Sequence, residues 1–286
     1  MKPAYITRDF LRHFITSALA EDVGEGDHST LASIPAEARK TAKLLVKDEG
    51  VLAGVALAKE IFNYAEPGIE MQVYLQDGAP VKRGDVAFSV TGSARTILIV
   101  ERLVLNCMQR MSAIATKTRH YANLIEGTKA QLLDTRKTTP NFRLPEKWAV
   151  LIGGGKNHRI GLYDMIMLKD NHIDMAGGIS AAINRTKEYL RTINKALPIE
   201  VETRNLSEVR QVLDAGGVDI IMLDNMDLQT MREAVRLIGA RCKTEASGGV
   251  TEETIRAIAE CGVDYISVGA LTHAVKSLDL SLKASG

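Results

Sequence analysis

The segment IEVETRNLSEVRQVLDAGGVDIIMLDN, residues 199–225, decides the fold class of this chain. It begins with the short apolar run Ile199–Val201, continues with a stretch of helical period from Ser207 to Ala215, and ends with a second apolar run at Ile220–Leu223. A pair of glycines, the residue type that often ends a helix, separates the helical stretch from the second run. The segment therefore predicts a strand, a helix and a second strand in succession.

The same alternation extends over the chain from Gly127 onward. The further strand-like runs are Gln131–Leu133, Met165–Leu168, Lys243–Glu245 and Tyr265–Val268, and a second helical stretch covers Thr251–Cys261. Strands that alternate with helices in this way indicate βαβ units around a parallel sheet or barrel. Polar residues or glycines follow nearly every run, as at the active-site rim of a βα barrel, whereas an open doubly wound sheet gathers them at one switch point. A barrel is therefore favoured.

The first part of the chain has a different pattern. Thr41–Gly54 and Ile69–Thr91 read as strands and turns, and Leu98–Ala115 carries an apolar pattern of helical period. We therefore expect an α/β protein with a small N-terminal α+β domain, residues 1–112, that includes most of this helix. A barrel domain, residues 113–286, follows it, with a C-terminal tail able to pack back on the first domain.

The composition is that of an ordinary globular protein, with 45% hydrophobic and 25% charged residues. The 36 Lys and Arg nearly balance the 35 Asp and Glu, which argues against a nucleic-acid partner. The three cysteines form no CxxC pair, so we expect free thiols and no zinc. No apolar run is long enough for a membrane span, and Phe14–Ala20 fits an amphipathic helix better than a signal peptide. We expect a cytoplasmic protein without a membrane partner.

Positive charge is concentrated in one stretch, residues 134–172. Its main cations follow two strand-like runs or lie between them: Arg136, Lys137, His158, Arg159 and Lys169. One cation at a strand end is most often a solvated surface charge, but several together suit an anion with more than one negative group. The stretch therefore predicts a ligand that carries phosphates, carboxylates or both.

Two carboxylates, Glu202 and Asp224, end the next two strand-like runs. They suit Mg²⁺, which takes few carboxylates and keeps water and substrate oxygens as its other ligands. They equally suit ribose hydroxyls or an oxocarbenium-like transition state. Glu200 lies two residues before Glu202 and therefore on the same strand face. The rim position favours Glu202, but the pattern leaves open which of the two faces the site.

Small residues mark the ends of the last two strand-like runs. Ser247, Gly248 and Gly249 follow one run, and Gly269 with Ala270 follows the other. Glycines at such positions let backbone N–H groups approach a phosphate, and the final strand loops of βα barrels often bind one. These two loops predict a phosphate site.

Eight segments in a fixed order resemble the quinolinate phosphoribosyltransferase family, also called nicotinate-nucleotide pyrophosphorylase (carboxylating). They are EDVGEGDHST (21–30), ERLVLNCMQRMSAIAT (101–116), DTRKTTPNFR (134–143), GGGKNHRIGLYDMIMLKDNHI (153–173), EVE (200–202), LDN (223–225), EASGGV (245–250) and VGALTHA (268–274). They extend over nearly the whole chain, and TRKTTP, NHRxGLxD and KDNH together are highly specific. One departure is Asn141, where the family usually has Gly; Asn tolerates the left-handed backbone best among other residues, so we expect the loop shape to survive.

The resemblance implies a pentosyltransferase of NAD biosynthesis. The family converts quinolinate and phosphoribosyl pyrophosphate to nicotinate mononucleotide, pyrophosphate and CO₂, with Mg²⁺ and no organic cofactor. Its fold is a small α+β domain followed by an incomplete βα barrel of the type II phosphoribosyltransferase kind. It works as a homodimer, with higher assembly left open, in which Arg102 of the ER-x-x-LN helix enters the neighbouring subunit's site.

The resemblance also implies a role for individual residues. The basic ones bind quinolinate, the carboxylates lie near ribose and Mg²⁺, directly or through water or substrate, and the glycine loops hold the 5′-phosphate. The implied substrate-binding set is Arg102, Thr135, Arg136, Lys137, His158, Arg159, Lys169, Glu202, Asp224, Ser247, Gly248, Gly249, Val268, Gly269, Ala270 and His273. Within it, the implied catalytic residues are Lys137, Lys169, Glu202 and Asp224, and the implied metal ligands are Glu202 and Asp224.

Three other readings compete with this one. A Schiff-base barrel such as an aldolase would use Lys169 as its nucleophile. A paralogue could act on another pyridine or on a molybdenum-related ligand. A barrel kept only as an anion-binding or regulatory subunit is the third reading, and the intact set of charged residues argues against it.

Overall fold

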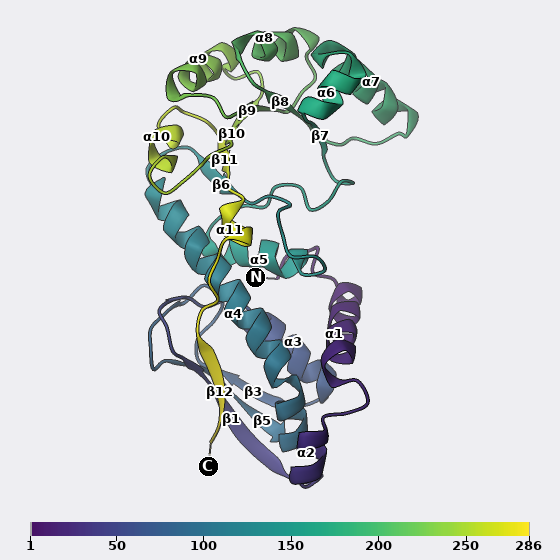
Figure 1. Cartoon of the computed structure of the whole chain (residues 1–286), viewed down its shortest axis with the longest axis vertical. Helices are drawn as coiled ribbons and strands as arrows, with labels where there is room; N and C mark the ends of the chain where they lie inside the picture. The colour runs from purple at the N-terminus through teal and green to yellow at the C-terminus, as the bar shows by residue number, and fades with distance from the viewer. Residues whose placement is uncertain (1, 286) are drawn as a thin grey trace. The chain divides into compact units, whose positions relative to one another are not determined.

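The computed structural model describes residues 2–285 (Figure 1). The chain forms two compact units, each assembled from separate stretches of sequence. The first unit combines Met1–Arg119, Thr138–Gly154 and Leu271–Gly286, and the second combines His120–Lys137 with Gly155–Ala270. Within residues 2–285, no helix is both long and apolar enough to cross a bilayer.

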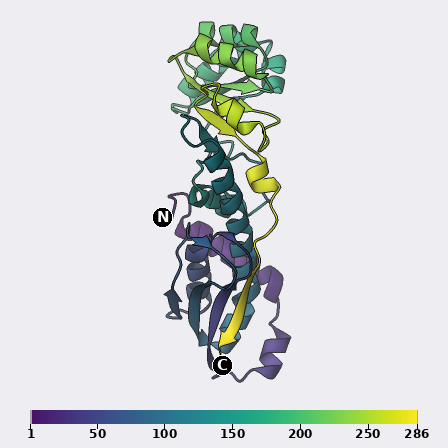
Figure 2. The same cartoon turned by 90° about the vertical axis from the view of Figure 1, so that its left-hand side faces the viewer.

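The first unit contains a four-stranded antiparallel sheet with the order β12-β1-β5-β3. Its strands are β1 (Arg39–Val46), β3 (Glu70–Val73), β5 (Val86–Ser93) and β12 (Leu280–Ser285), and a separate ribbon pairs β2 (Gly50–Val51) with β4 (Pro80–Val81). Alternate residues of β1, namely Ala42, Leu44 and Val46, are buried, because one face of the strand packs on a core. The C-terminal strand β12 runs along β1 (Figure 2), so the end of the chain forms one edge of this sheet.

Helices of the first unit supply the rest of its core. They are α1 (Arg8–Val23), α2 (His28–Ser33), α3 (Val55–Ala65), α5 (Arg143–Gly153), most of α11 (Ala270–His273) and most of α4 (Ala94–Leu124). Helix α3 buries Leu57, Ile61 and Phe62 on one face, and the ring of Phe62 meets that of Phe88 edge to face at 6.1 Å. Helix α4 has 31 residues and is therefore much longer than the predicted stretch Leu98–Ala115.

The second unit is built on a six-stranded sheet with the order β6-β11-β10-β9-β8-β7, in which all pairs are parallel. The strands are β6 (Gln131–Leu133), β7 (Ile166–Leu168), β8 (Ile199–Thr203), β9 (Ile220–Asp224), β10 (Lys243–Ser247) and β11 (Tyr265–Ser267). The sheet is curved but does not close, since β6 and β7 form its two edges (Figure 1). This arrangement confirms the predicted α/β class with an incomplete βα barrel, and each strand lies where a strand-like run predicted it.

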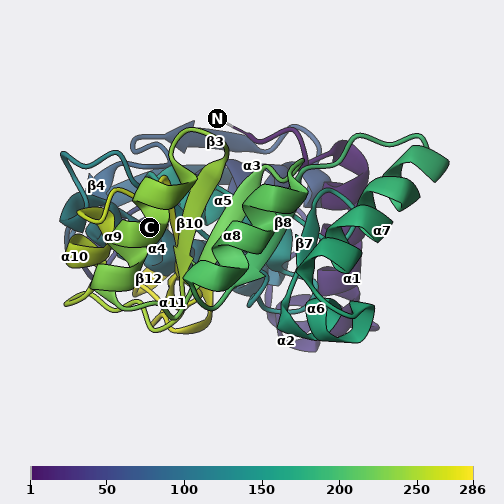
Figure 3. The same ribbon diagram turned by 90° about the horizontal axis from the view of Figure 1, so that it is seen from above.

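Helices α6 (Asp170–Ala176), α7 (Ile179–Thr192), α8 (Leu206–Ala215), α9 (Leu228–Ile238) and α10 (Ile255–Ala259) connect these strands and cover the outer face of the sheet (Figures 1 and 3). Two of them have strong starting signals. The side chain of Asn205 accepts a hydrogen bond from the backbone of Glu208 at the start of α8, and Asp227 caps α9 in the same way. The concave face of the sheet, opposite these helices, receives the polar side chains described below.

The structure differs from the sequence expectations in two places. The segment between Lys137 and His158, to which no element was assigned, contains helix α5, and Lys147 within it is fully buried. The second difference concerns α10, which begins at Ile255 instead of Thr251. There, the hydroxyl of Thr254 accepts a hydrogen bond from the backbone N–H of Thr251. Such a bond from the backbone to a nearby side chain competes with helical structure, so the helix starts after Thr254.

Candidate active site

Parallel strands β8, β9 and β10 bring their last residues to one edge of the sheet. The register pairs Glu202 with Met222 and Ser247 with Asp224, so all three polar residues follow one another along that edge. Glu202, Asp224 and Ser247 are all half-buried. The sequence prediction that these strand ends converge is confirmed.

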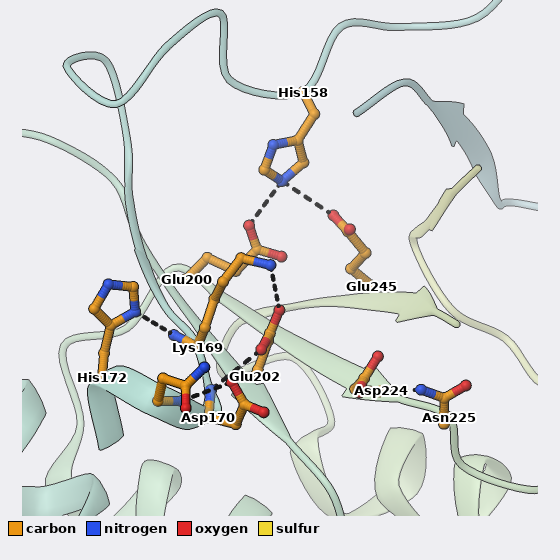
Figure 4. Close-up of polar contacts among 10 residues, drawn as sticks. His158, Lys169, Asp170, His172, Glu200, Glu202, Asp224, Asn225 and Glu245 are labelled. Carbon is orange, nitrogen blue, oxygen red and sulfur yellow. Dashed lines mark hydrogen bonds and ion pairs between the residues drawn. The ribbon is translucent and has the colours of Figure 1, made fainter. Parts of the chain in front are cut away.

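Lys169 joins the same group from the end of β7. Its ammonium Nζ lies 3.2 Å from Glu202 Oε1, and the backbone N–H of Asp170 donates to the other oxygen of Glu202 (Figure 4). The ring of His172 accepts a hydrogen bond from the Lys169 backbone at 3.1 Å, which fixes the start of α6. We call Lys169, Glu202, Asp224 and Ser247 the strand-end row.

A second group, which we call the inner cluster, consists of His158, Glu200 and Glu245. Nε2 of His158 lies 2.8 Å from Glu200 Oε2 and 3.5 Å from Glu245 Oε2 (Figure 4). Both carboxyl groups are fully buried. Burial raises the pKa of Glu200 to about 7. Burial and the nearby Glu200 carboxyl raise the pKa of Glu245 to about 8.

The open question about β8 now has an answer. Glu200 and Glu202 share a strand face, as predicted, but they occupy different environments. Glu202 is half-buried in the strand-end row, whereas Glu200 is fully buried against His158. The candidate substrate-facing carboxylate is therefore Glu202.

The backbone of His158 is held by Asp134, a fully buried residue after β6. One carboxylate oxygen of Asp134 accepts from the His158 backbone N–H at 2.9 Å, and the other accepts from the side-chain amide of Asn157 at 2.6 Å. Sequence reasoning noted Asp134 as a polar strand-end residue and gave it no role. The available signal was the position of an acid in the run DTRK, directly after a predicted strand. An acid that is buried there needs a hydrogen-bond partner, because unpaired buried carboxylates are rare.

Two arginines lie close together near these groups. The pKa of Arg159 is lowered, first by partial burial and then by the positive charge of Arg136. Its guanidinium reaches the carbonyl of Met165 at 3.4 Å, and Asp164 shapes the loop by accepting from the backbone of Ile160 and Gly161. The negative charges of Glu200, Asp164 and Glu202 partly offset the repulsion by Arg136. Two half-buried guanidinium groups are the side chains best suited to bind a polyanion through paired hydrogen bonds.

The loop Ser247–Gly249 has a conformation that requires glycine. Gly248 has φ 90°, and a Cβ added there would lie 2.3 Å from the side-chain oxygen of Asn225. Asn225 itself has φ 52°, and its backbone N–H donates to the carbonyl of Ser247. The amide of Asn225 also donates to Asp224. Asn225 thus packs against the glycine loop and contacts Asp224, a role that the LDN motif did not reveal.

The remaining predicted residues lie as follows. Thr135 accepts from the backbone N–H of Lys137, which is exposed. After β11, Val268 is buried, and Gly269 and Ala270 are half-buried. Arg102, on α4, and His273, at the end of α11, belong to the first unit and are exposed.

The chain segment after Lys137 is anchored inside the first unit by Glu146, a residue that sequence reasoning missed. Its fully buried carboxylate accepts from the Arg110 guanidinium at 2.9 Å and from both the backbone and the hydroxyl of Thr139 at 3.0 and 2.8 Å. We call Glu146, Arg110 and Thr139 the Glu146 cluster. Nearby, Asn141 adopts φ 60°, the left-handed conformation predicted for it.

Two groups of carboxylates could hold a divalent cation, and they differ in their ligand types and in their exposure to solvent. Within residues 2–285, the inner cluster is the one group of three or more His, Cys, Asp or Glu side chains close enough to share an ion. Glu202 and Asp224 offer only carboxylate oxygens at adjacent strand ends and are partly open to solvent. Hard oxygen donors with room for further ligands fit Mg²⁺ held partly by water and substrate oxygens.

Comparisons with known proteins cover almost the entire chain. The model of the quinolinate phosphoribosyl transferase N-terminal domain matches residues 27–112, and that of the C-terminal domain matches residues 114–283. A chloroplastic nicotinate-nucleotide pyrophosphorylase (carboxylating) from Oryza sativa is 48% identical over 296 residues, which cover 98% of this chain and 79% of the relative. A probable nicotinate-nucleotide pyrophosphorylase (carboxylating) from Bacillus subtilis is 42% identical over 96% of this chain and 92% of its own.

Solved structures agree with these matches. NadC from Streptococcus pyogenes superposes with a TM-score of 0.91 at 38% identity, covering 98% of each chain. A nicotinate-nucleotide pyrophosphorylase from Ehrlichia chaffeensis superposes with a TM-score of 0.89 at 33% identity and full coverage of both chains.

Proposed function

This chain belongs to the quinolinate phosphoribosyltransferase family, and from that premise we propose that it makes nicotinate mononucleotide in NAD biosynthesis. As a decarboxylating pentosyltransferase, it transfers the phosphoribosyl group of phosphoribosyl pyrophosphate to quinolinate and releases pyrophosphate and CO₂. The observation that carries this proposal is the match of both family domains, in order, over residues 27–112 and 114–283. The polar strand ends of the second unit supply the chemistry that such a reaction needs.

The quinolinate half of the proposed site consists of the cations Arg136, Lys137, His158, Arg159 and Lys169, with Thr135 beside them. Quinolinate carries two adjacent carboxylates, and arginines bind carboxylates through two parallel hydrogen bonds that also fix orientation. Partial burial, and then the positive charge of Arg136, lower the pKa of Arg159, and a bound dianion would offset both effects. A ring held in this way presents its nitrogen to the sugar carbon, which is a large part of the catalysis.

The phosphoribosyl half of the proposed site consists of the later strand ends. Glu202 and Asp224 stabilise the positive charge that develops on the sugar as pyrophosphate leaves, while Lys137 and Lys169 act with them as catalytic residues. Backbone N–H groups of Ser247, Gly248 and Gly249 hold the 5′-phosphate. Val268, Gly269, Ala270 and His273 complete the proposed phosphate side.

We propose Mg²⁺ as the metal and no organic cofactor. Glu202 and Asp224 would hold the ion directly or through water and substrate, and the ion, when bound, would offset the charge of the pyrophosphate. The positively charged ring nitrogen of the N-ribosylated product can itself stabilise the carbanion left when CO₂ departs. The substrate therefore fills the role that pyridoxal or thiamine plays in other decarboxylases.

The assembly, the location and the domain boundary remain proposals. The proposed partner is a second copy of the chain, with the exposed Arg102 reaching the neighbouring subunit's site. A cytoplasmic location is supported by Cys107, Cys242 and Cys261, all of which are free thiols. The boundary between residues 112 and 113 also stays a prediction, with helix α4 continuing across it.

The reaction can be tested directly by mixing purified protein with quinolinate, phosphoribosyl pyrophosphate and Mg²⁺. We expect nicotinate mononucleotide and CO₂ in equal amounts, and poor reaction when nicotinate replaces quinolinate. Absence of product from quinolinate would contradict the proposal. The rival Schiff-base reading predicts a borohydride-trapped adduct at Lys169, and failure to trap one would leave the transferase reading ahead.

A further inference from the structure

The inner cluster contains buried polar atoms that the proposed reaction does not explain. Glu200 and Glu245 are fully buried, and within residues 2–285 Glu200 Oε1 and both carboxyl oxygens of Glu245 lack a hydrogen bond of good geometry, although Ser267 and the other acid lie close enough to Glu245 to affect its pKa. Leaving polar atoms unsatisfied in a core costs free energy, so such atoms are rare and usually have a specific use. A purely structural core would fill these two positions with apolar side chains.

Both carboxyl groups are directed towards the same imidazole. One polar atom from each of His158, Glu200 and Glu245 lies within 4.8 Å of those from the other two. Glu200 lies two residues before Glu202 on β8, and Glu245 lies two residues before Ser247 on β10. Residues two apart on a strand share a face, so both acids point to the face that carries the strand-end row.

His158 is therefore restrained from two sides. Asp134 accepts from its backbone N–H, and Oε2 of Glu200 makes a hydrogen bond of 2.8 Å with its ring nitrogen Nε2. The hydrogen bond made by one ring nitrogen of histidine decides the tautomer and the orientation of the other. A carboxyl group placed at Nε2 thus determines how the remainder of the ring can act.

We propose that Glu200 and Glu245 are positioning residues for His158, holding its imidazole in one orientation with Nε2 engaged by a carboxyl group, so that a hydrogen on Nδ1 can be donated to a quinolinate carboxylate. This inference rests on the proposed function and deepens it, since it assigns a use to two acids outside the set of residues that bind substrate. Glu200 makes the direct hydrogen bond. Glu245 limits the movement of the ring, because its Oε2 lies 3.5 Å from Nε2 and Glu245 is itself fully buried.

A metal ion is the main rival occupant of the inner cluster. Its ligand set, one imidazole and two carboxylates, suits a transition metal or zinc in general terms. The separation of 2.8 Å between Nε2 and Glu200 Oε2 is, however, the length of a direct hydrogen bond, which leaves Nε2 engaged with the carboxyl group. We therefore assign the contact to a hydrogen bond and test for metal directly.

The test is a double-mutant cycle on Glu200→Gln and His158→Ala, with kcat and both KM values measured for each variant. We expect each single change to raise the KM of quinolinate about tenfold or more, as for other hydrogen-bond partners of functional histidines. The KM of phosphoribosyl pyrophosphate should change less than about twofold. The double variant should be no worse than His158→Ala alone, because Glu200 acts through His158. Losses that multiply, or equal rises in both KM values, would overturn the proposal.

The control variant is Thr203→Val, which removes a buried hydrogen bond from the same strand but on the other face. It should lower stability slightly and leave both KM values unchanged. If circular dichroism shows that Glu200→Gln does not fold, Glu245→Gln takes its place in the cycle, with the same expected pattern. Better retention of quinolinate affinity in Glu245→Gln than in Glu245→Ala would support positioning by a polar group; equal loss would count against it.

Two further outcomes separate the possible failures. Wild-type protein that makes no product contradicts the proposed function itself, whereas active wild type with multiplicative losses contradicts only the positioning role. Elemental analysis of purified wild type should find no stoichiometric transition metal or zinc. A bound metal that disappears in Glu200→Gln would replace the proposal with a metal site.

Discussion

Two fully buried carboxylate clusters in this protein differ in one respect, the partners that their oxygens find. In the Glu146 cluster, both oxygens of Glu146 accept hydrogen bonds, from Arg110 and twice from Thr139. In the inner cluster, the carboxyl groups of Glu200 and Glu245 both face the imidazole of His158. Among the described residues, Glu200 Oε1 and Glu245 Oε1 have no hydrogen bond of good geometry. Acids that are buried to the same extent therefore have different roles. Glu146, whose oxygens are both hydrogen-bonded, stabilises the fold, whereas the incompletely hydrogen-bonded acids of the inner cluster lie beside the candidate site and indicate a function.

Glu146→Gln should have the largest effect on stability. It leaves the partly buried Arg110 guanidinium without its charged partner, and breaking such a pair costs about 3 kcal/mol. Urea unfolding measures this loss. The KM of quinolinate should stay within about threefold of wild type, because the Glu146 cluster holds only the loop after Lys137. A decrease in the free energy of unfolding of less than about 1 kcal/mol would contradict the stabilising role assigned to the Glu146 cluster.

The inner cluster should make stability depend on pH, with a sign that the raised pKa of Glu245 determines. Burial raises this pKa to about 8, so the folded protein keeps a proton that the unfolded chain releases at a lower pH. The folded state then binds more protons between the two pKa values, and the free energy of unfolding falls as pH rises through this window. Between about pH 5 and pH 8 we expect the wild type to lose at least about 1 kcal/mol that Glu245→Gln does not lose.

Urea unfolding at several pH values checks this difference. The matching change in the Glu146 cluster, Glu146→Gln, should leave the slope between these pH values as steep as in wild type. A wild-type curve that is flat, or one that rises with pH, would contradict the assignment of a proton to the buried acids.

Gly248→Ala tests the phosphate half of the site, with a smaller effect. The added Cβ would meet the side chain of Asn225 at a position with φ 90°, so the loop must shift, at a cost of about 1 to 2 kcal/mol. We expect the KM of phosphoribosyl pyrophosphate to rise about tenfold and that of quinolinate to change little, the reverse of Glu200→Gln. Steady-state kinetics with each substrate varied in turn measures both. An unchanged KM for phosphoribosyl pyrophosphate would remove Gly248 from the proposed phosphate cradle.

Thr203→Val should have the smallest effect. It loses one buried hydrogen bond from the Thr203 hydroxyl to the carbonyl of Met222, worth about 1 kcal/mol. Since the hydroxyl lies on the strand face opposite Glu200 and Glu202, thermal unfolding should shift by a few degrees while kinetics stay constant. A change in either KM would show that substitutions in β8 act on the site without regard to face.

The features that could be predicted from the sequence are those that follow from the alternation of strand-like and helical segments. Short apolar runs ending in polar residues located all six strands of the second unit, and the convergence of Lys169, Glu202 and Asp224 followed from parallel strand order. Depth within the curved sheet could not be predicted in this way. Glu200 and Glu202 are equivalent by alternation, and only the three-dimensional packing places one against His158 and the other at the edge.

Helix α5 and the roles of the three glycines were missed because both depend on the surrounding structure and not on local sequence. Helix α5 was missed because Pro145 reads as a helix breaker, yet it lies in the first turn, where proline has no hydrogen bond to lose. Sequence reasoning assigned no packing role to the three glycines of residues 153–155. Gly153 packs so closely on α4 that a Cβ would lie 2.6 Å from the Ala115 carbonyl, and Gly154 caps α5 with φ 98°. Close packing of this kind leaves no trace in a single sequence.

Calorimetric titration of quinolinate into wild type, Glu200→Gln and Glu146→Gln tests the central contrast most directly. Both variants remove one buried charge, and circular dichroism at the titration temperature establishes that both are folded. The account predicts that Glu200→Gln weakens the Kd of quinolinate at least about tenfold, while Glu146→Gln stays within about twofold of wild type. Equal weakening in both variants, or unchanged binding in Glu200→Gln, would contradict it.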